Sequence, residues 1–210
     1  MPNTPITREQ WKLMAVLSLF WGTLFGALGI FFPYYSLYLH EDLGLTGQQV
    51  GTAMGVFHLI GLIGQPAWGY IADRTGSRKR VLVILSTGMA LGFVAFWFVE
   101  KYTMLLLVSA VFAAFYTSLI PQGMALCLGL LYRSNNSHFE WVRAFGSVGF
   151  LVTCFGFPYL LDAMKTESGG ANMGLLFPCS AAIILLTTMT VFFIPNQEAI
   201  REKAEPGSWR

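Results

Sequence analysis

Segment 69–80, which reads GYIADRTGSRKR, carries one acidic and four basic side chains between two long apolar stretches. Its candidate functional residues are Gly69, Asp73, Arg74, Gly76, Arg78 and Lys79. If the preceding stretch is a helix, Asp73 lies at its C-terminal end, where the helix dipole disfavours an anion. A neighbouring cation would stabilise this carboxylate, and Gly76 could supply a left-handed turn. These residues alone indicate either an ordinary basic turn or an ion-paired cluster with a function of its own.

Polar side chains inside the apolar stretches could line a pathway for a polar solute. His58 lies 15 residues before Asp73 and 16 after Asp42, near the middle of its stretch. An imidazole titrates near neutral pH and could carry a coupled proton, or it could stay neutral and bond to a neighbouring helix. The other candidates are Tyr34, Tyr35, Tyr38, Gln65, Tyr116 and Gln122.

Arg143 is a cation near the start of another apolar stretch, 19 residues before Asp162. At 1.5 Å per residue it would lie near the membrane surface, where a long arginine can snorkel towards water. Alternatively, its guanidinium could point into an internal cavity. Glu140, three residues earlier, would share its helix face and could neutralise it.

The composition predicts the elements that position these residues. Hydrophobic residues make up 55% of the 210 residues and charged residues only 11%, whereas soluble domains carry roughly 25% charge. This excludes a soluble domain, a disordered chain and a nucleic-acid-binding protein. Six stretches without Lys, Arg, Asp or Glu each reach the ~18 residues of a spanning helix; they are 13–39, 43–72, 81–99, 102–132, 144–161 and 168–197. Because a bilayer leaves backbone groups no water to bond, the chain is predicted to be an all-α membrane protein with six transmembrane helices.

The basic residues predict the orientation and the domain boundaries. Eleven lysines and arginines fall on one side of the six predicted helices and only Lys101 and Lys165 on the other. The positive-inside rule therefore predicts that both termini and the 73–80 loop are cytoplasmic. Residues 1–10 form a cytoplasmic tail, 11–195 form the bundle, and 196–210 form a second tail or the start of an interdomain loop.

Glycines and aromatic residues predict how the helices pack. The glycine pairs 22 and 26, 51 and 55, and 88 and 92 have the spacing that allows helices to approach closely. Phe93, Phe96 and Phe98 are expected to face lipid.

The ordered pattern of segment 69–80 resembles the signature loop of the major facilitator superfamily, G-x-[LI]-[AS]-D-[RK]-x-G-x-[RK]-[RK], at every fixed position. The resemblance implies the N-terminal six-helix half of a twelve-helix transporter, built as a 3+3 inverted repeat. It further implies that the loop aspartate and basic residues latch the cytoplasmic side shut during alternating access.

A second segment, 139–150 (FEWVRAFGSVGF), is similar to the start of helix 5 in proton symporters of the lactose, nucleoside and phenylpropionate permease type. Segment 32–39 (FPYYSLYL) agrees with that group. The sugar symporters pair the helix 5 arginine with an acid on helix 4. This chain has PQGMAL at 121–126 and no acid there, which argues against sugar recognition.

These resemblances imply a secondary active transporter in the inner membrane that moves a small organic solute together with protons. Its expected partners are the solute, protons, the lipid bilayer and a second six-helix half that is missing or separate, because the chain ends in what resembles an interdomain loop. Dimerisation of half-units is the alternative to a fragment. The alternative function is a six-helix accessory protein without transport activity. Because no catalytic or metal-binding motif is found, we expect no enzyme activity, cofactor or metal site.

Overall fold

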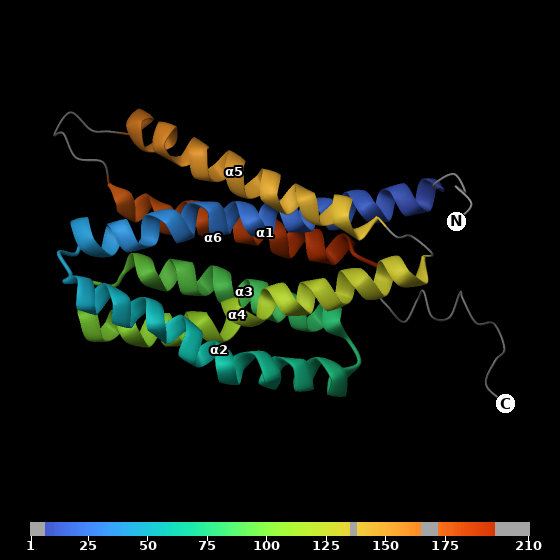
Figure 1. Ribbon diagram of the computed structural model, residues 1–210, viewed down its shortest axis with the longest axis horizontal. Coiled ribbons are helices and arrows are strands. Elements are labelled where there is room, and N and C mark those ends of the chain that lie inside the picture. Colours follow the sequence, from blue (N-terminus) through green and yellow to red (C-terminus); the bar gives the residue numbers. More distant parts are fainter. Residues whose placement is uncertain (1–6, 135–137, 165–171, 196–210) are drawn as a thin grey trace.

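The computed structural model describes residues 7–134, 138–164 and 172–195, and it places six long helices in one bundle (Figure 1). They are α1 (Arg8–Glu41), α2 (Gly47–Thr75), α3 (Arg78–Trp97), α4 (Tyr102–Arg133), α5 (Phe139–Ala163) and α6 (Leu176–Phe193), with a short 3-10 helix, η1 (Met173–Leu175), before α6. Each of the six is long and apolar enough to cross a membrane. The prediction of six transmembrane helices is therefore confirmed.

Local sequence signals account for several helix ends. Thr7 with Gln10 and Thr46 with Gln49 form reciprocal capping boxes at the starts of α1 and α2. Gly76 ends α2 with a φ of +65°, so the predicted left-handed turn is confirmed. This turn lets α3 begin two residues later with the chain direction reversed.

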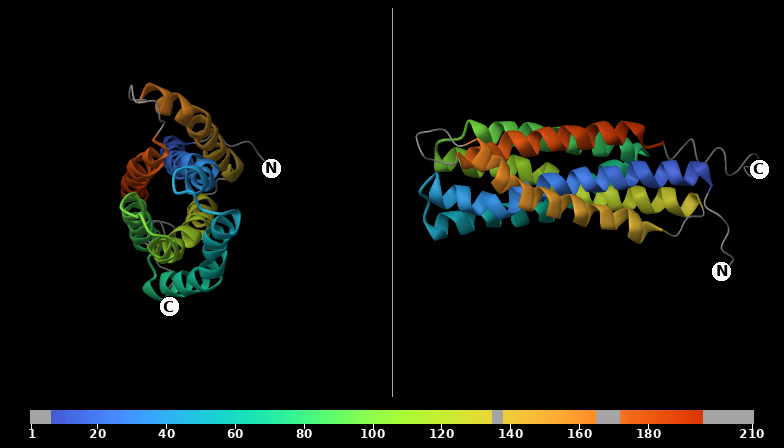
Figure 2. Two further views of the ribbon diagram at one scale, coloured as in Figure 1. Left: turned by 90° about the vertical axis from the view of Figure 1, so that its left-hand side faces the viewer. Right: turned by 90° about the horizontal axis from the view of Figure 1, so that it is seen from above.

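The packing of the helices repeats every three elements. The helix α1 packs against α5 and α6, its counterpart α4 packs against α2 and α3, and α3 packs against α6. Exchanging α1–α3 with α4–α6 reproduces this set of neighbours, as expected for a 3+3 repeat. Figure 2 shows α1 and α4 in the middle of the bundle, with α5 and α2 at its two ends. The prolines follow the repeat as well, because Pro66 and Pro158 each lie 19 residues after the first residue of their helix.

Small residues set the closest helix contact, between α1 and α5. A Cβ atom on Gly149 would overlap the carbonyl oxygen of Gly22, and one on Gly29 would overlap the backbone of Phe150. The hydroxyl of Thr153 donates to the carbonyl oxygen of Gly26 across the same contact at 2.7 Å. The role expected for the first glycine pair is thus confirmed.

The other two glycine pairs differ from each other. Cβ atoms on Gly88 and Gly92 would overlap the rings of Phe115 and Phe112 of α4, which confirms the expected contact. By contrast, a Cβ atom on Gly51 or Gly55 would meet nothing within 4 Å in the part of the chain that the structure describes. The prediction that this pair packs closely is therefore wrong for the six-helix bundle alone.

Aromatic side chains fill the centre of the bundle. The rings of Phe31 and Tyr35 stack with centroids 4.6 Å apart, and Phe31 also contacts Phe93, Phe96 and Phe112. Phe93 and Phe96 are fully enclosed, whereas Phe98 is 76% exposed. The expectation that all three face lipid holds only for Phe98, since α3 turns the other two towards α1 and α4.

Candidate functional site

The loop between α2 and α3 contains the ion pair that the sequence predicts. Arg78 Nη2 donates to Asp73 Oδ1 at 3.0 Å, with the two side chains 32% and 71% exposed. An ion pair with this much solvent contact contributes little to stability, on the order of 0–1 kcal/mol. Breaking this ion pair therefore costs the folded protein little free energy.

The other two cations expected around Asp73 have different partners. Arg74 Nη1 donates to the hydroxyl of Tyr70 at 3.2 Å. Lys79 Nζ donates to the carbonyl oxygens of Phe192 and Ile194 at 2.8 and 2.5 Å, where α6 ends. A lysine at this place satisfies carbonyls that have no partner within their helix. Among the described residues, Arg78 forms the ion pair with the aspartate, while Lys79 joins the loop to the end of α6.

A polar pocket of about 340 Å³ lies beside this ion pair, against the last turns of α4. Its lining residues are Ala72, Asp73, Gly76, Arg78, Ala125, Gly129 and Arg133. Sequence reasoning did not identify the contribution of α4. The signal was present as small residues at 125 and 129 followed by Arg133, because residues four apart share one face of a helix.

Gly69 and Gln122 meet where α2 packs against α4. A Cβ atom on Gly69 would lie 3.7 Å from Gln122 Nε2, an ordinary contact distance. Gln122 is only 8% exposed. Its amide is enclosed between helices in the described bundle, and its place along a solute pathway stays a prediction.

Arg143 lies over two aromatic rings of α1. Its guanidinium carbon is 4.1 Å from the ring centroid of Phe25 and 4.9 Å from that of Trp21. Such cation–π contacts contribute about 0.5–2 kcal/mol each, more when water is excluded, as it is around the fully buried Trp21. The guanidinium folds onto α1 instead of extending to the end of the bundle as a snorkelling anchor would, and the role of a cavity cation stays a prediction.

The pairing expected between Arg143 and Glu140 is absent. Within the ranges that the structure describes, no carboxylate lies within 4.0 Å of the Arg143 guanidinium, and Glu140 is exposed. Trp21 and Phe25 were not identified from the sequence, although their four-residue spacing marks one face of α1. The structure thus holds a half-buried arginine whose charge has aromatic neighbours and, within the described ranges, no acidic partner.

The remaining predicted pathway residues are dispersed. His58 is exposed on α2, and its Nδ1 lies 3.2 Å from the carbonyl oxygen of Met54 in the same helix, so the expected bond to a neighbouring helix is not made. Gln65, seven residues on, is exposed on the same face of α2. Since α2 and α5 lie at opposite ends of the bundle (Figure 2), these side chains do not meet Arg143.

Tyr34 and Tyr35, which are adjacent on α1, make different contacts. The hydroxyl of Tyr34 donates to the carbonyl oxygen of Cys154 in α5 at 2.8 Å. Tyr35 is fully buried in the aromatic core, with its hydroxyl 3.2 Å from that of Ser109. Tyr35 is thus part of the aromatic core in the described bundle, and its role along a solute pathway stays a prediction.

Comparison with known proteins places the chain among membrane transporters. Residues 13–207 match the family described as MFS_1 like family. The chain is 30% identical over 184 residues to "Uncharacterized transporter YwbF" of Bacillus subtilis (strain 168), covering 88% of this chain and 45% of the relative. It is also 30% identical over 175 residues to "Probable 3-phenylpropionic acid transporter" of Escherichia coli (strain K12), covering 76% of this chain and 44% of the relative.

A solved structure shares the fold. The crystal structure of the nucleoside transporter NupG superposes with a TM-score of 0.79 at 16% identity, covering 94% of this chain and 47% of that one. The chain therefore spans less than half the length of these proteins. A family match over most of the chain, six membrane-length helices and this shared fold lead to one conclusion: the chain is an integral membrane protein of the MFS_1 like family and forms the N-terminal half of a major facilitator fold.

Proposed function

We propose that this chain is half of a secondary active transporter that carries a small organic anion, working by alternating access with a second six-helix unit. The observation that carries the proposal is Arg143, a half-buried cation on aromatic rings without an acidic partner among the described residues. A cation inside a membrane protein is costly unless it serves a partner or a substrate. A carboxylate solute would supply the missing charge and accept two hydrogen bonds from one guanidinium.

Two further observations support the proposal. One relative is named as a probable 3-phenylpropionic acid transporter, and 3-phenylpropionic acid carries a carboxylate and an aromatic ring. A solute of this kind suits Arg143 beside the rings of Trp21 and Phe25. Apolar side chains such as Leu62 are exposed on α2 at one end of the bundle, where a second unit could pack. The accessory-protein alternative has no comparable support, since the relatives cited above are transporters.

The direct test is solute uptake by the transport-competent protein with its second unit, reconstituted in vesicles with an inward proton gradient. Accumulation of 3-phenylpropionate without accumulation of 3-phenylpropanamide is expected, because the amide has the same ring and no charge. Equal uptake of both compounds would contradict an anion site.

We also propose that protons drive the transport and that His58 takes part. The imidazole is exposed near the middle of α2, on a face that no described helix covers, and imidazole nitrogens can accept and release a proton. We expect His58→Gln to lose proton-driven accumulation while solute counterflow exchange persists, because exchange needs no net proton movement. Thr52→Ala, at an exposed position of α2 outside the predicted pathway residues, is the control. If accumulation survives in His58→Gln, the proton site lies elsewhere.

The ion pair of the α2–α3 loop is proposed to act as a latch. Asp73 lies at the end of the bundle and outside the region of Arg143, so its loss should shift a conformational equilibrium and leave solute contacts intact. Asp73→Asn is therefore expected to lower the turnover rate several-fold with little change in KM. Arg80→Gln, an exposed charge in the next helix, serves as the control. Wild-type turnover of a normally expressed Asp73→Asn protein would refute the latch.

The orientation in the membrane is proposed from charge. The ends of α2, α4 and α6 lie on the same side as the start of α1, as the contacts of Gln10 with Ser134 and of Lys79 with Ile194 require. This side carries nearly all the described lysines and arginines, so it should be cytoplasmic. In a cysteine-free background, cysteines introduced at Ser77 and Glu100 should be labelled from opposite sides. Labelling of both from outside would refute this orientation.

A further inference from the structure

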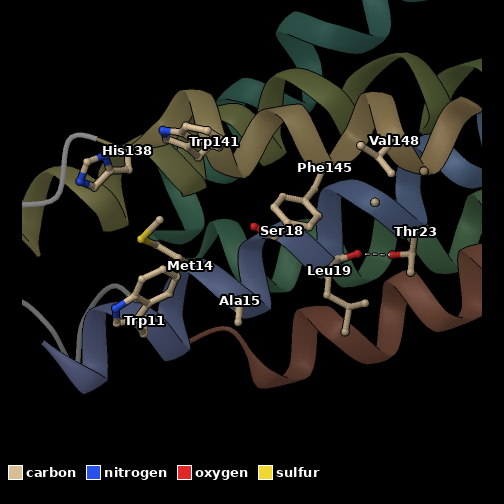
Figure 3. Close-up of a pocket in the computed structure, with 12 residues that line it drawn as sticks. Trp11, Met14, Ala15, Ser18, Leu19, Thr23, His138, Trp141, Phe145 and Val148 are labelled. Carbon is tan, nitrogen blue, oxygen red and sulfur yellow. Dashed lines mark hydrogen bonds between the residues drawn. The ribbon is translucent and has the colours of Figure 1, made fainter. Parts of the chain in front are cut away.

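An open groove of about 840 Å³ runs between the N-terminal parts of α1 and α5 (Figure 3). Ala15, Leu19 and Thr23 form one wall, and Phe145 and Val148 form the other. The groove ends towards the middle of the two helices, where α1 and α5 come into contact at Gly22 and Gly149. At its other end, near the starts of the two helices, Trp11 lies on the α1 side and His138 and Trp141 lie on the α5 side, as Figure 3 shows.

The groove lies on the opposite side of the α1–α5 contact from Arg143. Arg143 reaches α1 at Trp21 and Phe25, neither of which lines the groove. Gly26, one turn after Gly22, is in contact distance of Ile183 of α6, and α6 runs along the groove side of α1 in Figure 3. The groove is therefore separate from the site proposed for the solute.

The walls suit a hydrocarbon chain. Leu19 is 57% exposed and Val148 54% exposed. The hydroxyl of Thr23 donates to the carbonyl oxygen of Leu19 within its own helix at 2.9 Å, so it has no need of a partner in the groove. Inside a bilayer, an apolar surface of this kind is adjacent to acyl chains.

The length of the groove matches a single leaflet. Trp11 and Thr23 are 12 residues apart on α1, which is ~18 Å along a helix. The hydrocarbon core of a bilayer is about 30 Å thick, so one leaflet contributes about 15 Å. An acyl chain that enters at Trp11 would end near the closed contact of Gly22 with Gly149.

The end of the groove at the starts of α1 and α5 has the side chains of a headgroup region. Trp11 and Trp141 are largely exposed there, and tryptophan is enriched at the level of lipid headgroups. Arg8 is exposed and lies three residues before Trp11, on the same face of α1. Beside the groove, Lys12 is paired with Glu9 at 3.0 Å, and the basic side chains of α2, α3 and α4 lie away from the α1–α5 contact. Among the described residues, Arg8 is therefore the cation that an anionic headgroup would meet at the groove.

We propose that this groove is a binding site for one acyl chain of an anionic phospholipid, whose headgroup lies beside Arg8. The site is independent of the solute site and of the proposed transport activity. The bound lipid would contact both α1 and α5, on the side of these helices that faces away from Arg143.

Native mass spectrometry of the purified full chain, titrated with dioleoyl phosphatidylglycerol or dioleoyl phosphatidylcholine, tests the proposal. The wild-type chain should retain one phosphatidylglycerol more tightly than phosphatidylcholine. Ala15→Trp and Val148→Trp fill the groove from opposite walls, and each should weaken retention at least about tenfold, the effect of losing contact with two or more methylene groups. Ala182→Trp, on an exposed position of α6, should stay within about twofold of wild type.

The headgroup is tested by charge removal. Arg8→Gln should weaken phosphatidylglycerol retention about fivefold, as expected for one basic residue near a membrane surface. Arg80→Gln, at the same end but on α3, should have no such effect on this one lipid.

Equal retention by Ala15→Trp, Val148→Trp and Ala182→Trp, or equal retention of the two lipids by wild type, would overturn the proposal. Because either groove-filling variant suffices, misfolding of one does not prevent the test.

Discussion

Replacing Arg143 with glutamine is expected to abolish most solute transport, with kcat/KM for an organic anion falling about 10- to 100-fold. Hydrogen bonds to a charged group contribute roughly 1.5–3 kcal/mol, which corresponds to this range. The loss should be large because the charge of Arg143 has no acidic partner among the described residues that could be rearranged to compensate. Arg143→Lys should recover only part of the activity, since an ammonium lacks the planar fork of donors.

The measurement is initial uptake rate against solute concentration in the reconstituted transport-competent protein. Thermal unfolding in detergent must accompany it, because Arg143 also covers the rings of Trp21 and Phe25. Arg80→Gln removes an exposed arginine at the same end of the bundle and provides the control. A stable Arg143→Gln protein with wild-type anion uptake would show that this arginine does not bind the solute.

Gly149→Ala is expected to destabilise the bundle more than its single methyl group suggests. The new Cβ would overlap backbone atoms of Gly22, which cannot move aside as a flexible side chain could. Overpacking of this kind costs roughly 1–3 kcal/mol, and α1 and α5 would have to separate along their contact. For a chain of this size the unfolding temperature should fall by about 5 °C.

Gly55→Ala is the matched control for this change. A Cβ atom at Gly55 meets nothing within 4 Å in the described bundle, so alanine should leave stability unchanged or raise it by up to ~1 kcal/mol through its higher helix propensity. Thermal unfolding of the two variants side by side gives the comparison. Similar unfolding temperatures for both would mean that the α1–α5 contact is looser than its geometry shows. A loss in Gly55→Ala alone would place an additional partner against α2.

Features that depend on neighbouring residues along the chain could be predicted from the sequence. The left-handed turn at Gly76 and the Asp73–Arg78 ion pair both form within segment 69–80, so their geometry follows from short-range spacing. The six helices follow for a similar reason. A bilayer offers no water to backbone groups, and each long uncharged stretch must satisfy its own hydrogen bonds as a helix.

The side that each residue faces could not be predicted from hydrophobic pattern. In a soluble protein polar residues mark the outer face of a helix, but lipid is as apolar as the core, so both faces of a membrane helix look alike in sequence. Phe93 and Phe98 illustrate this, since both lie on one phenylalanine-rich stretch and only the first is enclosed. Tyr34 and Tyr35 are adjacent in sequence, yet one bonds to α5 and the other lies in the core.

The sequence by itself therefore determined the helices, the charged loop and the family resemblance, because these rest on local hydrogen bonding, local charge and an ordered motif. Only the tertiary structure decided that Arg143 lies on Trp21 and Phe25, more than a hundred residues earlier, without Glu140 as a partner. It alone decided as well that Lys79 leaves the loop cluster to bond the end of α6. The physical reason is that small residues such as Gly22 and Gly149 fix which helices touch, and contact between distant helices then selects the partner of each charge.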